Sequence, residues 1–187
     1  MKENIVAKGK IFELVQTTQP DGRVFEVARR APGTRVIIHD EAAGKILLTR
    51  EFRRELGEWD YRLPGGKVFD TLGAYEAFRA SGENIVDAAM KQAKNEALEE
   101  AGVEVDAFTF VSKSTLGATV EWDLYVFEAT AWRVHENGQQ LEADEAQDIA
   151  EAEFYDYEAV REMIMSGAMQ EDRIAMVLLR WLEGRGK

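Results

Sequence analysis

Short apolar runs bounded by glycine, proline and aspartate recur along the chain and predict a mixed α/β protein. Pro20, Asp21 and Gly22 form a turn signal, because proline fixes φ and glycine accepts positive φ. The runs on either side of this turn predict an N-terminal antiparallel hairpin. Strands are expected at residues 9–16, 23–29, 34–39, 45–50, 108–114, 121–129 and 150–157.

Three longer segments have helical character. Residues 84–101 contain no proline and are rich in alanine, lysine, glutamine and glutamate, which favours a helix that Gly102 ends. Asn84 is expected to cap this helix, with Asp87 completing a capping-box-like arrangement. The chain is expected to close with two helices, the second of which should dock its apolar face on the sheet. They are expected at residues 158–165 and 170–182.

Three glutamates gather on one face of the 84–101 helix. Glu96, Glu99 and Glu100 stand at positions i, i+3 and i+4, so their carboxylates are neighbours. Each like-charged pair costs about a few tenths of a kcal/mol on an isolated helix. A divalent cation such as Mg²⁺ would make this grouping of charges favourable, because it binds carboxylate oxygens. It also keeps bound waters that a phosphate can replace. A solvated acidic face is the alternative.

The composition restricts the class of protein. At 187 residues, with 45% apolar and 31% charged residues, the chain fits one globular domain. The absence of cysteine excludes disulfides and thiol catalysis, and two histidines disfavour a His-rich zinc site. The net charge of −12 argues against nucleic acid as a partner. No segment has the apolar length of a signal peptide or a membrane span, so we expect a cytoplasmic protein without membrane association.

The segment around the acidic helix resembles the Nudix box, whose pattern is Gly-x5-Glu-x7-Arg-Glu-U-x-Glu-Glu-x-Gly-U with U aliphatic. Gly66, the last residue of Leu-Pro-Gly-Gly, matches the opening glycine, and residues 96–103 match the closing half. The resemblance implies an α/β/α sandwich with a mixed central sheet. It also implies metal-dependent hydrolysis, with Mg²⁺ or Mn²⁺ as cofactor. The implied metal ligands are Glu96, Glu99, Glu100 and the carbonyl of Gly65.

The box is interrupted in its middle. Asn95 stands where the family has an arginine that pairs with one of the box acids, and residues 69–83 are an insertion in which a short helix is expected. The family's first acid would fall on Asp87, which lies about opposite the Glu96 face on a helix, so capping is its favoured role. Because all three metal-binding acids are present, we predict a working enzyme. A non-catalytic Nudix-like module that binds a nucleotide metabolite is the alternative.

Two further segments resemble the ADP-ribose pyrophosphatase and GDP-mannose hydrolase branch of the family. Residues 46–53 resemble a segment ending in Gln-Tyr/Phe-Arg, which makes Arg53 a candidate phosphate contact. Simple charge balance with neighbouring acids is the alternative for Arg53. Residues 144–149 resemble the acidic loop before the last strand, where Glu145 matches the proposed general base. A solvated acidic loop is the alternative there, and Glu99 completes the expected catalytic pair.

The resemblance extends over a single domain of residues 1–187, with residues 1–31 as an N-terminal extension. It implies cleavage of the pyrophosphate bond of a nucleoside diphosphate linked to another moiety, either ADP-ribose or a sugar nucleotide. In this branch a comparable N-terminal sheet helps to form a homodimer, which we also expect here. An enzyme that removes oxidised nucleoside triphosphates is disfavoured, because such Nudix proteins are usually shorter and lack the extension.

Overall fold

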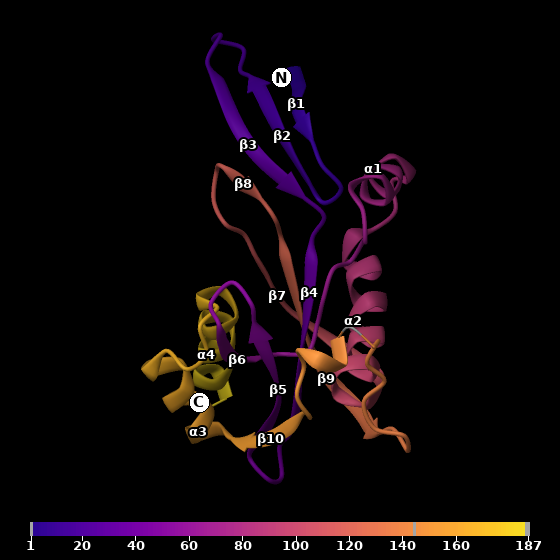
Figure 1. Cartoon of the computed structure of the whole chain (residues 1–187), viewed down its shortest axis with the longest axis vertical. Coiled ribbons are helices and arrows are strands. Elements are labelled where there is room, and N and C mark those ends of the chain that lie inside the picture. Colours follow the sequence, from indigo (N-terminus) through magenta and orange to yellow (C-terminus); the bar gives the residue numbers. More distant parts are fainter. Residues whose placement is uncertain (1, 144, 186–187) are drawn as a thin grey trace.

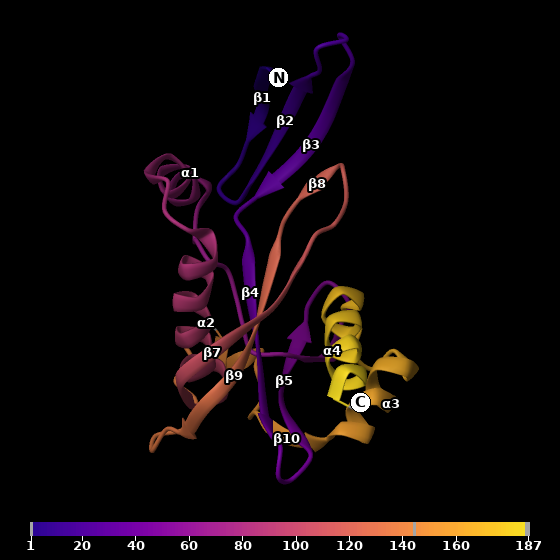
Figure 2. The ribbon, with the colours of Figure 1, turned by 180° about the vertical axis from the view of Figure 1, so that it is seen from behind.

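The chain folds into a central α/β/α sandwich with a second β-sheet extending from one end of it (Figures 1 and 2). The computed structural model describes residues 2–143 and 145–185, and the description does not extend to the side chain of Glu145. The helices are α1 (Leu72–Ser81), α2 (Ile85–Ala101), the 3-10 helix η1 (Glu145–Gln147), α3 (Tyr157–Ser166) and α4 (Asp172–Arg185). The strands are β1 (Lys2–Lys8), β2 (Phe12–Thr18), β3 (Val24–Arg30), β4 (Gly33–Asp40), β5 (Lys45–Arg53), β6 (Glu58–Arg62), β7 (Val103–Ser114), β8 (Val120–Glu121), β9 (Leu124–Val134) and β10 (Glu153–Asp156).

The central sheet is mixed and lies between two helical layers. Its strand order is β10-β5-β4-β9-β7, and β6 also pairs with β5. Strands β4 and β9 are parallel, whereas the other pairs are antiparallel. Helix α2 packs on one face, and α3 and α4 pack on the other (Figure 1). The expected α/β/α sandwich is confirmed.

Strand β4 shows how the sequence builds both cores of the sandwich. Successive side chains of a strand point to opposite faces of the sheet. Val36 and Ile38 therefore join the core under α2, whereas Ile37 joins the core under α3 and α4. All three side chains are fully buried. A strand that is buried on both faces has a continuous apolar sequence, and this is the pattern at residues 36–38.

The second sheet contains the expected N-terminal hairpin and two additional strands. Its order is β1-β2-β3-β8, in which β2 and β3 form the hairpin. The hairpin turn contains Gly22, which has a φ of 87° and donates its N–H to the carbonyl of Gln19 at 3.0 Å. Every residue of β1 is exposed. A strand without a buried face has no apolar alternation, which explains why the sequence pattern misses it.

The insertion and the long helix end where their capping residues predict. Helix α1 follows Thr71, whose side chain caps it, and ends at Gly82 with a φ of 76°. Asn84 caps α2 by accepting a backbone N–H at 3.0 Å, and Gly102 ends this helix with a φ of 64°. The helix expected at residues 84–101 is thereby confirmed. Asp87 is exposed in the first turn, where its charge faces the positive end of the helix dipole.

Strand β6 reverses the usual relation between polarity and burial. Its buried side chains are those of Asp60 and Arg62, whereas Trp59 is exposed. Asp60 accepts from Arg62 at 2.9 Å and from the backbone N–H of Gln170 at 2.7 Å. The inverted pattern explains why the sequence does not predict this strand. Both closing helices are confirmed with shifted ends, and no helix in the described ranges is long and apolar enough to cross a membrane.

Candidate active site

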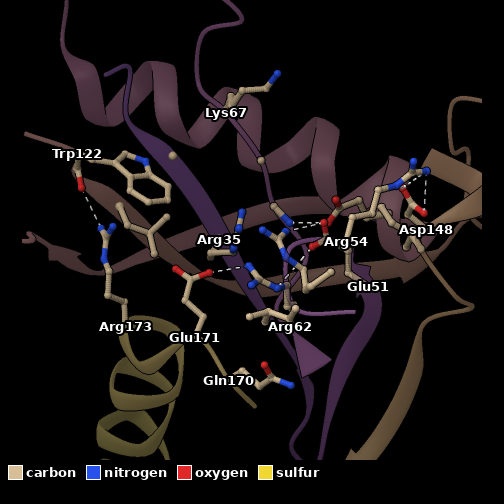
Figure 3. A pocket seen from close by; sticks show the side chains of 18 of the residues that line it. Arg35, Glu51, Arg54, Arg62, Lys67, Trp122, Asp148, Gln170, Glu171 and Arg173 are labelled. Carbon is tan, nitrogen blue, oxygen red and sulfur yellow. Dashed lines mark hydrogen bonds and ion pairs between the residues drawn. The ribbon is translucent and has the colours of Figure 1, made fainter. Parts of the chain in front are cut away.

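A cavity of about 890 Å³ opens where β4, β5, the loop at residues 63–67, the end of α2 and the start of α4 meet (Figure 3). Within the described part of the chain, seven basic side chains and four acidic ones line it. The cavity is therefore locally positive although the whole chain carries a net charge of −12. Arginine forks match phosphate oxygens well. The basic residues are Arg30, Arg35, Arg53, Arg54, Arg62, Lys67 and Arg173.

Two adjacent glycines let the loop approach both β4 and α2. A Cβ on Gly65, whose φ is 149°, would lie 2.2 Å from the carbonyl oxygen of Thr34. A Cβ on Gly66 would lie 2.2 Å from Oε1 of Glu96. A side chain at Gly65 would collide with the backbone of β4, whereas one at Gly66 would displace the carboxylate of Glu96. The loop therefore brings its backbone directly against the acidic helix.

Glu96 and Glu100 form a close pair of acids at this contact. They are one turn apart on α2, Glu96 is buried with 9% of its surface exposed, and Glu100 lines the cavity. The backbone N–H of Gly65 donates to Oε2 of Glu100 at 2.7 Å. Burial, and next the charge of Glu96, raise the pKa of Glu100 to about 8, whereas Arg35 and the Gly65 N–H oppose this rise. A divalent cation would offset the repulsion, so this pair fits a metal.

The third glutamate of the expected metal site lies on the more open side of the helix. Glu99 is exposed, and its backbone carbonyl accepts the N–H of Gln140 at 2.9 Å. Within residues 2–143 and 145–185, no three His, Asp or Glu side chains converge as a complete metal-binding group. The metal roles of Glu96, Glu99, Glu100 and the carbonyl of Gly65 therefore stay predictions.

A short relay of amide side chains holds Glu96 where the family has an arginine. Gln92 Nε2 donates to Oε1 of Glu96 at 2.9 Å. Asn95, the residue at the family's arginine position, donates to Oε1 of Gln92 at 3.4 Å. The side chain that positions Glu96 is therefore Gln92, which lies one turn earlier on α2 and carries no charge. Sequence reasoning did not identify Gln92, although its i, i+4 spacing from Glu96 is a signal that could have found it.

Arg53 lies in the cavity wall, as its candidate role requires. Its guanidinium donates to Glu51 at 2.8 Å and makes a second, short contact with Glu55. The adjacent Arg54 pairs with Asp148 at 2.8 Å. Both arginines are therefore partly neutralised by carboxylates at this end of the cavity. The role of Arg53 as a phosphate contact stays a prediction.

The side chain of Glu145 lies outside the described residues, so its role as general base also stays a prediction. Residues 148 and 150, which follow it in the chain, are hydrogen-bonded to β5 beside the cavity. Phe52 donates its N–H to the carbonyl of Asp148 at 2.6 Å, and Ala150 donates its N–H to the carbonyl of Arg50 at 2.8 Å. The side chain of Asp148 lines the cavity (Figure 3).

Four further lining residues carry no signal in the sequence. Arg30 is the last residue of β3, Arg35 lies in β4, Trp122 lies between β8 and β9, and Arg173 lies at the start of α4. No motif connects these positions. The fold alone brings them together around one end of the cavity.

A mixed sheet between two helical layers, with a double-glycine loop packed on an acidic helix, defines the Nudix class of α/β/α sandwich. A family model described as NUDIX domain matches residues 29–176, and the chain belongs to this family. The expected Nudix family and enzyme class, a Nudix pyrophosphohydrolase, are thereby confirmed.

One solved structure similar to this chain is described as "Crystal structure of ADP compounds hydrolase". The match has a TM-score of 0.65 at 18% sequence identity, and it covers 100% of this chain and 94% of that chain. It supports the fold. No curated protein sequence matches the chain.

Proposed function

We propose that this protein hydrolyses the pyrophosphate bond of a nucleoside diphosphate linked to another moiety, with ADP-ribose or a sugar nucleotide as the substrate class. The observation that carries the proposal is the Glu96 and Glu100 pair against Gly65 and Gly66, opening into a cavity lined by seven basic side chains. The cavity volume of about 890 Å³ suits a ligand of this size. The similar solved structure, described as an ADP compounds hydrolase, agrees with this choice.

The site is proposed to hold Mg²⁺ or Mn²⁺ through Glu96, Glu99, Glu100 and the carbonyl of Gly65. The neighbouring carboxyl groups of Glu96 and Glu100 support this assignment, because a bound cation would favour the ionised form of Glu100, which burial and the charge of Glu96 oppose. When bound, the cation supplies neutralisation of charge on the diphosphate oxygens and orientation of the substrate.

The chain's own residues are proposed to bind the substrate and to move the proton. Arg53 would hold the diphosphate, and Glu145 would accept a proton from the attacking water, with Glu99 as the second catalytic acid. Attack on phosphorus forms one P–O bond and breaks the bridging P–O bond. The products are two phosphomonoesters.

The assembly is proposed to be a cytoplasmic homodimer of a single 187-residue domain, with residues 1–31 as an extension and residues 69–83 as an insertion. Apolar side chains on the second sheet support a dimer, because they are exposed to solvent in the single chain. These include Ile5, Val6, Phe12 and Phe25, which are 40–50% exposed. We propose no nucleic-acid partner. The molar mass in solution, measured by light scattering, tests the dimer, and a 21.1 kDa species would contradict it.

The enzyme proposal is tested by incubating the purified protein with ADP-ribose, GDP-mannose, NADH and nucleoside triphosphates, with and without Mg²⁺. Release of phosphomonoesters is followed by chromatography. Glu100→Gln retains an acceptor for the Gly65 N–H but removes the charge, so we expect it to abolish metal-dependent release. Asp87→Asn is the matched control, because Asp87 is an exposed acid on the same helix outside the main cavity.

Metal-dependent release that Glu100→Gln loses and Asp87→Asn keeps would support the proposal. Equal loss in both variants would refute the assignment of Glu100 to the site. No turnover, together with tight binding of one compound, would favour the non-catalytic binding module. Asn95, in place of the family's arginine, is the residue that motivates this second function.

A further inference from the structure

Two arginines from separate elements pack on one tryptophan, and a third arginine lines the same cavity. Arg30 lies 4.2 Å from the ring centroid of Trp122, and Arg173 lies 4.9 Å from it. Arg35 lines the same cavity and acts electrostatically on both of these arginines. Figure 3 shows Trp122 and Arg173 at one side of the cavity, Arg54 and Asp148 at the other, and Arg35 between them. We call Arg30, Arg35, Arg173 and Trp122 the arginine cluster.

The arginine cluster differs from the other arginines of the cavity in its lack of carboxylate partners. Within the described residues, neither Arg30, Arg35 nor Arg173 forms an ion pair. Arg35 and Arg173 donate hydrogen bonds to backbone carbonyls. By contrast, the other three cavity arginines all pair with acids.

Carboxylates near the cluster are already engaged elsewhere. Glu171 accepts from Arg62 at 2.6 Å, and Asp123 accepts from Lys113 at 3.1 Å. The Nε atoms of all three cluster arginines are buried without a hydrogen-bond partner, as is Nε1 of Trp122. The cluster thus holds several buried donors that the described side chains and backbone do not satisfy, and each such donor is costly.

The charges of the cluster also oppose one another. Burial, and next the charge of Arg35, lower the pKa of Arg30. Burial is also the main cause that lowers the pKa of Arg173. The charges of Arg35 and Arg30 lower this pKa further, whereas those of Glu171 and Asp123 raise it. An anion at the cluster would relieve this repulsion and accept the free N–H groups. A phosphate suits this role, because guanidinium forks bind its oxygens in pairs.

We propose that the arginine cluster is a subsite for a phosphomonoester that the substrate carries in addition to its diphosphate. The inference rests on the proposed function, and it narrows the substrate class to phosphorylated nucleoside diphosphate derivatives. The diphosphate has to lie beside the Glu96 and Glu100 pair, and Arg35 is close enough to lower the pKa of Glu100. Arg173 and Trp122 lie beyond Arg35 in Figure 3, and Arg30 packs on the ring of Trp122. A second anionic group on the same ligand would reach them.

The test compares compounds that differ by one phosphomonoester. The pairs are ADP-ribose and 2′-phospho-ADP-ribose, NADH and NADPH, and dephospho-coenzyme A and coenzyme A. Binding to the full chain is measured by calorimetry in EDTA, where turnover is suppressed, and kcat/KM is measured separately with Mg²⁺. We expect the phosphorylated member of at least one pair to bind on the order of 10- to 100-fold more tightly, the range for charged hydrogen bonds.

Two variants connect the preference to the cluster. Arg30→Gln and Arg173→Gln should each reduce the affinity ratio of that pair by about 10-fold. Arg133→Gln is the matched control, because Arg133 is exposed, pairs with Glu104 and Asp106, and lies outside the cavity. The control should leave the ratio unchanged.

The outcomes separate this inference from the proposed function. Affinity ratios near one for all three pairs of compounds in the wild-type protein would overturn the subsite, even if ADP-ribose is hydrolysed. A large ratio that both cluster variants leave unchanged would also overturn it. A large ratio that the variants reduce, without turnover of any compound, would support the subsite and refute the hydrolase proposal.

Discussion

Replacing Gly65 and Gly66 by alanine, one at a time, should have different effects. The first change should lower the stability of the fold, and the second should lower the activity of the site. A Cβ on Gly65 would lie 2.2 Å from the carbonyl oxygen of Thr34 and 2.8 Å from Cα of Arg35. Both are backbone atoms of β4 and cannot move aside cheaply. The φ of 149° at Gly65 adds strain of about 1–3 kcal/mol, and overpacking adds about 1–3 kcal/mol. The expected loss of stability is therefore roughly 2–6 kcal/mol.

Gly66→Ala meets only the end of a side chain. Its Cβ would lie 2.2 Å from Oε1 and 2.7 Å from Cδ of Glu96. The carboxylate has to shift by about 1 Å or more to restore ordinary contact. A displacement of about 1 Å at a reacting group can cost roughly 100-fold in rate. We therefore expect a folded protein whose metal-dependent turnover falls by about 100-fold.

The assay combines thermal unfolding in EDTA with kcat/KM measured across a Mg²⁺ series. For a chain of this size, the loss expected for Gly65→Ala corresponds to a Tm lower by roughly 5–20 °C. Gly66→Ala should unfold within a few degrees of the wild type. Gly73→Ala in α1 is the control, since its Cβ would meet only the Thr71 hydroxyl oxygen, at 4.0 Å. A wild-type Tm for Gly65→Ala, or full turnover for Gly66→Ala, would refute the packing of this loop on the helix.

The remaining expectations concern side chains that hold the site. Gln92→Leu removes the 2.9 Å hydrogen bond to Glu96 and should lower turnover by about 10- to 100-fold without changing Tm; equal activity at every Mg²⁺ concentration would contradict this. Asp60→Ala deprives Arg62 of a buried partner and should cost about 3 kcal/mol in urea unfolding, whereas a loss below about 1 kcal/mol would count against it. The pKa of Glu100 is raised from 4.5 to about 8, so between these pH values only the folded state holds the proton. The stability of the metal-free protein should fall as pH rises through this window. A pH series of Tm in EDTA checks this, and an identical slope for Glu100→Gln would show the reasoning to be wrong.

The acidic helix was predictable because its determinants are local. The spacing of Glu96, Glu99 and Glu100 is fixed by helix geometry, and the capping residues Asn84 and Gly102 fix the helix ends. The loop before it was predictable only as far as its glycines. A larger residue is disfavoured at these two positions because β4 and α2, which come from elsewhere in the chain, pack against them.

Strand β6 shows a different limit of sequence reasoning. Its buried residues are a carboxylate and a guanidinium that neutralise each other, which a pattern of apolar and polar positions reads as surface. A charge is buried at acceptable cost only when its partner is present, and the partners Glu171 and Gln170 come from the far end of the chain. The pattern at residues 58–62 therefore does not predict a buried strand without knowledge of the residues that pack against it in the fold.

The cavity shows why net charge is a poor guide to local chemistry. A value of −12 disfavours binding of a long polyanion, which would meet the field of the whole surface. At physiological ionic strength this field is screened beyond about 8 Å. A small phosphorylated ligand that enters the cavity would instead meet a wall that contains seven basic side chains among the described residues, in surroundings that screen their charges less. An acidic net charge is therefore compatible with the nucleotide site that we propose, and the fold, by placing Arg30, Arg35 and Arg173 around one cavity, provides the basis for that proposal.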